Sequence, residues 1–545
     1  MNVSTRTMLC LISTVVIGLL AAGCGQQAKS SKELNEFAAK IDLGTTIGSL
    51  VEVFSLDTIA VEGYSIVGGL NGTGSLECPP ELRAYLEQYI LKQSSRDKID
   101  IGKLISSMDT AVVRVDGIMP AAVSKNQHFD VRVAALDDTQ TTSLEGGWLY
   151  GAELKATGEF GIATKALAHA EGPVFIDTLS SDKPDKKSGY VLAGGTVGDE
   201  YKINLTLRRP DYKIANLIRN RINERFGQNT AKAVSPSLID LKVPAQYKQQ
   251  KQGFISLIKA TYLTQTPETA TERIRTFVRK LAVSQDKQDK YESEIALEAI
   301  GKDCLGQLAA LLNSSDGQVR LHAARCMLNL GSDAGLDSLR DTAMDKGSPY
   351  RIEALEAITM AANRNDAVAI SRKLLRDSNF DIRLRAYENL RKLDDIAIVQ
   401  KFVGQNFYLE KITQTPHKGI FVSRSSQPRI VLFGAPIYCR DNIFIQSEDA
   451  SITINAPPGQ NYVSLIRKHP KRPNVIVRLK SSFELGDIIQ TLGEEPLEKA
   501  GQEPRGLGVT YDELIALLKQ MHDKGAIDAE FRAGSLPKIG PIVKR

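Results

Sequence analysis

A glycine-rich stretch comes closer to a ligand-binding loop than any other part of the sequence. Gly68, Gly69, Gly72 and Gly74 fall within seven residues, and glycine-rich loops that open a helix bind phosphate through backbone amides. A phosphate loop ends in Gly-Lys-Ser/Thr or continues into a helix, whereas this stretch runs into Leu-Glu-Cys-Pro-Pro. The four glycines therefore predict positive φ angles or the close approach of another backbone, and no nucleotide binding.

The other residue types that perform chemistry are scattered. Ser180 and Lys183 match a Ser-x-x-Lys nucleophile pattern, but they lie in the polar run 180–188, which is typical of a solvated loop. No two histidines have the spacing of a metal site or of a serine-histidine pair; they are His128, His169, His322, His417, His469 and His522. The sequence predicts no catalytic residue, no metal site and no cofactor.

Cys24 differs from these residues because the segment before it marks it for modification. Arg6 is followed by an apolar run from Met8 to Leu20 and then by Ala-Ala-Gly before the cysteine, which is typical of an export signal and too short for a membrane span of about 20 residues. This ending resembles the lipobox of bacterial lipoproteins. The resemblance implies cleavage before Cys24, acylation of its thiol and anchoring in a membrane, with Gly25 favouring the outer membrane. A plain secretory signal is the alternative.

Length and composition limit the classes of protein. A chain of 545 residues predicts several domains, and 42% apolar with 24% charged residues is typical of globular proteins. The excess of 69 basic over 64 acidic residues is small and spread out, and the chain has one Trp, so we expect no nucleic-acid partner. The remaining cysteines are too sparse for a disulfide framework, although an exported protein could form one or two bridges: Cys78, Cys304, Cys326 and Cys439.

The first half of the chain mixes strand and helix patterns. Apolar and polar residues alternate at 112–115 and 129–133, as in half-buried strands. Residues 211–226 predict a helix with Asp211 as N-cap, Gly227 after its end and one apolar face formed by Ile214, Leu217, Ile218 and Ile222.

The middle of the chain contains an internal repeat. The pattern Arg-Leu/Ile-x-Ala begins at Arg320, Arg351 and Arg383, at separations of 31 and 32 residues. Each occurrence predicts the second helix of a pair, with the first helices over 305–313, 335–344 and 367–375. Helix pairs at this spacing resemble HEAT-like repeats, which stack into an α-solenoid scaffold. An irregular helical bundle is the alternative.

Strand patterns return from about residue 427, and a helix with the capping box Thr510/Glu513 follows, with an apolar stripe of Leu514, Leu517, Leu518 and Met521. The expected fold class is α+β and multidomain, with mixed α/β regions flanking an all-α, HEAT-like insertion. The expected segments are a signal peptide (1–23), a tether (24–46), an N-terminal region (47–266), a helical connector (267–288), helical repeats (289–404), a linker (405–426) and a C-terminal region (427–545).

Several blocks resemble one family in the order in which they occur. Residues 62–74, Glu-Gly-Tyr-Ser-Ile-Val-Gly-Gly-Leu-Asn-Gly-Thr-Gly, are similar to the N-terminal signature of flagellar basal-body P-ring proteins. Residues 143–149, Ser-Leu-Glu-Gly-Gly-Trp-Leu, resemble a second block of that family, and residues 204–227 resemble a third. Residues 485–488 and 507–530 resemble its closing helix and tail.

The resemblance implies a structural protein without enzymatic activity. Family members form a periplasmic ring of identical subunits around the flagellar rod, near the peptidoglycan and the outer-membrane ring protein. Here the glycines 68, 69, 72 and 74 would form an assembly loop, and Cys24 would add a lipid membrane as a partner. The alternative is a membrane-tethered periplasmic scaffold lipoprotein that recruits a protein partner through its helical repeats.

Overall fold

A computed structural model gives the fold and divides the chain into two compact units. The barrel unit comprises residues 55–203 and 371–545, and the helical unit comprises the chain through Phe54 together with 204–370. The residues that the structure describes are 43–54, 58–93, 100–120, 123–158, 164–181, 183–199, 203–248, 250–469, 472–496 and 505–539. Cys24 lies outside them, as do the expected signal peptide and most of the tether.

A closed β-barrel forms the first part of the barrel unit, with strand order β2-β3-β4-β7-β6-β5. Its strands are β2 (Ile59–Gly68), β3 (Thr110–Met119), β4 (His128–Ala135), β5 (Trp148–Ala156), β6 (Ala168–Pro173) and β7 (Ser188–Val197). Phe129, Val131 and Val133 alternate into the barrel core, so the predicted strand is confirmed. Helices α3 (Pro80–Gln93) and α4 (Ile101–Ile105) cover one side through Leu86 and Ile105.

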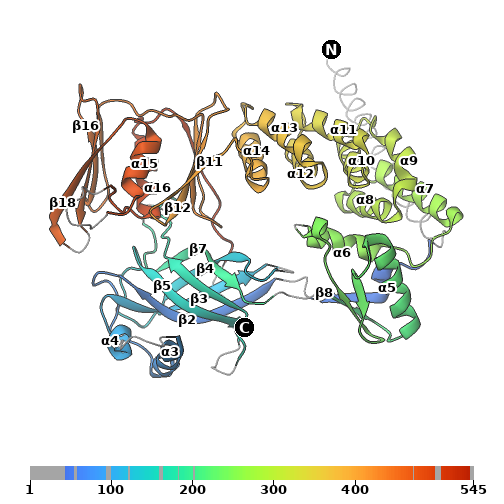
Figure 1. Cartoon of the computed structure of the whole chain (residues 1–545), viewed down its shortest axis with the longest axis horizontal. Helices are drawn as coiled ribbons and strands as arrows, with labels where there is room; N and C mark the ends of the chain where they lie inside the picture. The colour runs from blue at the N-terminus through green and yellow to red at the C-terminus, as the bar shows by residue number, and fades with distance from the viewer. Residues whose placement is uncertain are drawn as a thin grey trace, which may run out of the picture. The chain divides into compact units, whose positions relative to one another are not determined.

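The second part of the barrel unit has two sheets that share one apolar core. Figure 1 shows helices α15 (Leu485–Gly493) and α16 (Tyr511–Asp523) between these sheets. The first sheet has the order β11-β12-β14-β13-β19 and the second β15-β16-β17-β18. Their strands are β11 (Val399–Val403), β12 (Phe407–Ile412), β13 (Gly419–Val422), β14 (Arg429–Phe433), β15 (Ile443–Gln446), β16 (Ile452–Ala456), β17 (Val463–His469), β18 (Arg472–Ser481) and β19 (Glu530–Ala533).

The helical unit combines a small sheet with a run of helices. Its sheet has the order β1-β8-β10-β9. Helix α5 begins at the N-cap Asp211, whose carboxylate accepts bonds from the amides of Lys213 and Ile214. The other elements are α2 (Ile47–Leu50), β1 (Val51–Phe54), β8 (Ile203–Leu207), α5 (Tyr212–Phe226), β9 (Ala231–Ala233), β10 (Leu238–Leu241), η1 (Ala245–Tyr247), α6 (Lys251–Ala260), α7 (Pro267–Val283), α8 (Lys287–Ile300) and η2 (Lys302–Cys304).

The helices predicted from the repeat are present. They are α9 (Leu305–Leu311), α10 (Gly317–Asn329), α11 (Asp333–Met344), α12 (Arg351–Ala361), α13 (Arg364–Leu374) and α14 (Phe380–Lys392). Within the helical unit α9 packs on α10, α10 on α11 and α11 on α12. The α+β multidomain class with an all-helical segment is therefore confirmed, and the HEAT-like class of these pairs stays a prediction.

Three predicted boundaries differ from the structure. The expected linker 405–426 contains the strands β12 and β13 instead. A buried apolar run as short as Ile420 to Val422 looks like a linker in the sequence until its partner strand is known. The expected helical segment 289–404 ends with α14, and β11 follows it. The expected N-terminal region 47–266 is divided between the two units.

Two further observations concern membranes and thiols. Among the described residues, no helix combines the length and apolar character that crossing a bilayer requires. Cys78, Cys304, Cys326 and Cys439 are all free thiols in this structure, and only Cys78 is partly exposed.

Candidate functional site

The glycine-rich loop follows β2 and contains two glycines in the left-handed region. Gly69 has a φ of +84° and Gly72 a φ of +89°, and a Cβ atom on either would meet open space. Asn71 between them also has a positive φ, of +47°. Because only glycine adopts such angles without steric cost, these two positions need glycine for the path of the chain.

The other two glycines, Gly68 and Gly74, lie where other residues of the barrel approach the backbone closely. A Cβ on Gly74 would lie 2.1 Å from the carbonyl oxygen of Thr110, and a Cβ on Gly68 would lie 2.7 Å from the ring of Tyr150. The amide of Gly74 donates to the carbonyl of Met108 at 2.7 Å, and the amide of Ser75 donates to that of Thr110 at 2.8 Å. Positive φ angles and backbone approach, the two predicted reasons for the glycines, are both confirmed.

Thr73 connects this loop to the segment before β5. Its hydroxyl lies 2.8 Å from the carbonyl oxygens of Leu70 and Ser143, and its own carbonyl accepts a bond from the amide of Thr142 at 2.9 Å. The backbone of Gly147 also lies against Leu70, because a Cβ there would be 2.7 Å from the leucine side chain. The two sequence blocks 62–74 and 143–149 therefore fold into one surface at one end of the barrel.

Two aromatic side chains are exposed beside this loop. Trp148 pairs with Gly68 in the sheet register, and Trp148 and Tyr150 are each 49% exposed, while Leu149 between them is buried. Leu76, just after the loop, is 50% exposed. Exposed apolar groups gathered in this way are typical of interaction surfaces. We call Trp148, Tyr150 and the loop 68–74 the loop surface. The alternation of Trp148 and Tyr150 around the apolar Leu149 is the sequence signal that indicates these outward-facing rings.

The described residues show no arrangement suited to nucleophilic or metal chemistry. No group of three or more His, Cys, Asp or Glu side chains among them could hold a metal ion. Ser180 accepts a hydrogen bond from Arg424 at 2.7 Å, and the Ser181 hydroxyl donates to the carbonyl of Lys183 and accepts from its amide. All three residues of this Ser-x-x-Lys run that are described are exposed, as expected of a solvated loop.

The recurring arginines have a common structural task within their own units. Arg320 donates to the carbonyl of Ser314 at 2.6 Å, Arg351 to that of Ala343 at 3.0 Å, and Arg383 to that of Asp377 at 2.9 Å. Each carbonyl lies in the helix end or turn that precedes the arginine. Carbonyls at helix ends lack partners within the helix, so an arginine at this position of each repeat stabilises the turn.

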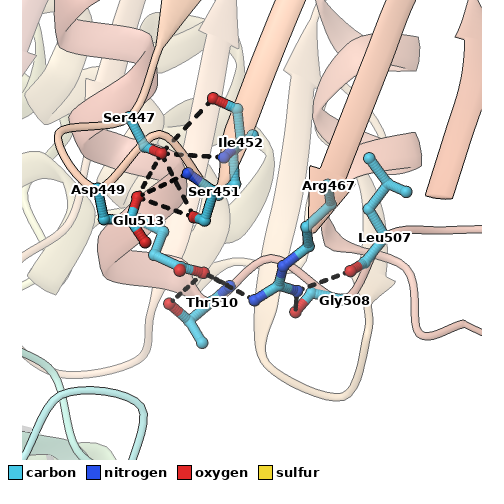
Figure 2. A network of polar contacts seen from close by, with 9 residues as sticks. All are labelled: Ser447, Asp449, Ser451, Ile452, Arg467, Leu507, Gly508, Thr510 and Glu513. Carbon is cyan, nitrogen blue, oxygen red and sulfur yellow. Dashed lines mark hydrogen bonds and ion pairs between the residues drawn. The ribbon is translucent and has the colours of Figure 1, made fainter. Parts of the chain in front are cut away.

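Helix α16 is held at its start by a polar network (Figure 2). Arg467 of β17 donates to the carbonyls of Leu507, at 2.6 Å, and Gly508, and forms an ion pair with Glu513 at 3.3 Å. Glu513 accepts bonds from the amide and hydroxyl of Thr510 at 2.9 and 3.0 Å. The predicted capping box is confirmed. The contacts from Arg467 have no local sequence signal, because Arg467 lies more than 40 positions before Glu513.

A cavity of about 50 Å³ lies beside the first turn of α16. Gly146 and Gly147, which come just before Trp148 in the chain, line it together with Phe175, Tyr511 and Asp512. Asp512 is 3% exposed, and its Oδ2 atom has no hydrogen-bond partner among the described residues. Burial raises the pKa of Asp512 to about 7, although a hydrogen bond with Thr510 opposes the shift. Sequence reasoning missed this residue, because nothing local to it indicates burial.

The comparisons with known proteins cover the part of the chain that contains the loop surface. Residues 46–274 match the family model described as Flagellar P-ring protein. Over these residues the chain is similar to flagellar P-ring proteins. The match contains both blocks of the loop surface and ends within α7, so the resemblance of residues 485–530 to the P-ring tail stays a prediction.

Curated P-ring proteins are similar to this chain at modest identity. Those of Thermotoga maritima, Desulfotalea psychrophila and Rhodopseudomonas palustris are 31%, 25% and 27% identical, over 36%, 37% and 46% of this chain. The chain spans 60%, 54% and 66% of the length of these three P-ring proteins. A crystal structure of an engineered protein aligns with 27% of this chain and 73% of its own, at 21% identity and a TM-score of 0.18, which is too low to compare folds.

Replacing Gly74 should destabilise the barrel unit more than replacing Gly72. Gly74→Ala places a methyl group against the Thr110 backbone, which cannot move aside, and should cost about 3 kcal/mol. Gly72→Ala introduces no clash, so it should cost only about 1 kcal/mol, which is the cost of placing an alanine in the left-handed region. Urea unfolding followed by the fluorescence of Trp148, the one tryptophan, reports this unit. Equal losses in the two variants would contradict the close-approach explanation.

Asp512→Asn should change how stability depends on pH. The folded pKa of about 7 exceeds an unfolded value of about 3.9, so the stability that neutral Asp512 provides is complete below pH 4 and is lost as the pH rises to 7. Asn stays neutral. The variant should match the wild type at pH 4 and exceed it at pH 8 by about 2–4 kcal/mol.

Asp449→Asn is the matched control for this measurement. Burial alone would raise the pKa of Asp449, but hydrogen bonds from Ser447 and Ser451 lower it below its usual value, as drawn in Figure 2. This substitution should therefore destabilise the protein at pH 8. A pH profile for Asp512→Asn that runs parallel to that of the wild type would show that Asp512 is ionised in the folded state.

Proposed function

We propose that this protein is a structural component of the bacterial flagellar basal body, in which copies of the chain assemble into a P-ring-like ring around the rod in the periplasm. The observation that carries the proposal is the family match over residues 46–274. It is supported by the folding of the two family-like blocks, 62–74 and 143–149, into one loop surface. The role requires no catalytic step.

The barrel provides a rigid body for such a role. A closed sheet has no free edge, because every strand pairs on both sides. The loop surface presents Trp148 and Tyr150 beside a glycine loop without bulky side chains at Gly69 and Gly72. We propose that this surface docks against a neighbouring copy or the rod, with the outer-membrane ring protein and the peptidoglycan layer nearby.

A second function is favoured by the segment beyond the family match. Helices α8 to α14 lie after residue 274, and stacked helix pairs are typical of protein-binding scaffolds. In this alternative the protein is a membrane-tethered periplasmic scaffold that recruits a partner through its helices. In the leading proposal the same helices form an insertion that decorates the ring.

Trp148→Ala should impair ring assembly without unfolding the protein. The side chain is half exposed, so its removal costs little stability but removes contact area from the loop surface. Negative-stain electron microscopy of basal bodies purified from the source cell, with tagged protein, should show the wild-type chain in a ring and the variant largely absent. Leu217→Ala is the control, because Leu217 is also 50% exposed and lies in the helical unit. Basal bodies that lack the wild-type protein would favour the scaffold alternative.

We further propose that the chain is anchored to the outer membrane through acylated Cys24. Cys24→Ser should abolish incorporation of a clickable fatty acid, whereas Cys78→Ser should leave it unchanged, because Cys78 lies within the folded barrel unit. Labelling of the Cys24→Ser variant at the wild-type level would mean that the signal is a plain secretory one.

A further inference from the structure

Two of the cysteines, Cys304 and Cys326, lie in the same apolar core of the helical unit. Cys304 is the last residue of η2, which joins α8 to α9, and Cys326 lies within α10. Both side chains are fully buried and belong to one cluster of apolar residues. Helix α10 packs on both α8 and α9 (Figure 1), so residues distant in sequence are brought together here.

The two thiols meet at the end of α8. The Cys304 thiol donates to the carbonyls of Gly301 at 3.1 Å and Leu297 at 3.5 Å. The Cys326 thiol donates to the carbonyl of Glu294 at 3.7 Å, one turn earlier on the same face of the helix. The thiols also interact with one another, because their contact lowers the pKa of Cys304 and, together with burial, raises the pKa of Cys326.

Joining the two sulfurs would leave these carbonyls with partners. A disulfide has no S–H group, so the bonds that the thiols donate would be lost. The carbonyl of Leu297 also accepts from the amide of Gly301 at 3.1 Å, and that of Gly301 accepts from the amide of Cys304 at 3.3 Å. The carbonyl of Glu294 lies inside α8, where the helix itself supplies a partner. Oxidation therefore costs no buried hydrogen bond that the backbone needs.

We propose that Cys304 and Cys326 form a disulfide bond that fastens α10 to the turn after α8. The inference rests on the proposed function for its location, because disulfides persist in an oxidising compartment such as the periplasm and are rare in the cytosol. Both cysteines follow residue 274, where the family match ends. The bond therefore belongs to the helices that lie beyond the matched region.

Formation of the bond requires an external disulfide as the oxidant. One cysteine thiolate attacks a sulfur of this oxidant, forms a mixed disulfide and displaces the other sulfur of the oxidant. The second cysteine thiolate then attacks the protein sulfur of the mixed disulfide and displaces the rest of the oxidant. Two protein thiols are oxidised, the oxidant is reduced to two thiols, and the two protons pass to those thiols. Because both cysteines are buried, the exchange takes place while the chain folds or opens locally.

The bond stabilises the short helix that it encloses. Helix α9 has seven residues, and a helix of this length depends on tertiary contacts. The bond closes a loop of about 20 residues around α9, which reduces the conformational freedom of the unfolded chain. We expect reduction of the bond to lower the melting temperature of the helical unit by about 10 °C.

Peptide mapping of the purified full chain tests the bond. The chain is equilibrated with oxidised and reduced glutathione just below its melting temperature, so that local opening admits the oxidant, and is then alkylated and digested without reduction. The tryptic peptides 303–320 and 326–340, which contain the two cysteines, should appear as one linked species that dithiothreitol separates. Recovery of both peptides in alkylated form would overturn the proposal.

Cys439→Ala is the matched control for this measurement. Cys439 is also buried, but burial, and no second thiol, raises its pKa to about 12. The linked species should persist in this variant. Dithiothreitol should lower the melting temperature of the wild type and of Cys439→Ala, followed by far-ultraviolet circular dichroism, and should leave that of Cys304→Ala unchanged. An equal shift in Cys304→Ala would overturn the proposal, because the reductant would then act on a different bond.

Trapping of the thiols in cells separates this inference from the proposed function. Source cells are quenched in acid and alkylated, so that each cysteine keeps the state that it had in the cell. A bond in the glutathione buffer and in cells supports both the pairing and the periplasmic location. A bond in the buffer with free thiols in cells would overturn the periplasmic location and leave the pairing standing. Absence of the bond from both would overturn the pairing and leave the ring proposal standing.

Discussion

Closure of the barrel constrains the rest of the barrel unit. Strand β2 pairs with both β3 and β5. This double pairing brings the backbone of β2 so close to that of β5 that a side chain at Gly63 would clash. A Cβ on Gly63 would lie 2.3 Å from the carbonyl oxygen of Glu153. Once the sheet is closed, the loop after β2 must turn sharply, which explains Gly69 and Gly72. Closure also leaves the barrel without a free edge strand.

The C-terminal segment depends on the same barrel. Asp130 of β4 accepts hydrogen bonds from the amides of Ala193, within the barrel, and Ser426, in the loop before β14. Arg424 forms an ion pair with Asp177 at 3.1 Å. These contacts join two parts of one unit that the helical segment separates in the sequence, and Asp512 becomes buried next to Gly146 and Gly147 as a result.

Local patterns predicted much of the fold because helices depend on neighbouring residues. The repeat predicted α9 to α14, and Thr510/Glu513 predicted the start of α16, since capping and 3.6-residue periodicity act within one or two turns. The same reasoning was wrong for Leu217, which is 50% exposed although the expected apolar face of α5 included it. Only Ala215, Ile218 and Ile222 of α5 are buried, because the position of the neighbouring sheet decides how wide the buried stripe is.

The sequence by itself determined the glycine requirement at 68–74, the multidomain α+β class and the family-like blocks, because these are properties of residue type and spacing. Only the tertiary structure decided that Thr73 joins those blocks, that β12 lies beside β14 in parallel, and that β15 and β18 end their sheet. Strand pairing joins residues far apart in the chain and has no local signal. The raised pKa of Asp512 has the same origin, since loss of water around a carboxylate depends on what packs over it and not on its neighbours in sequence.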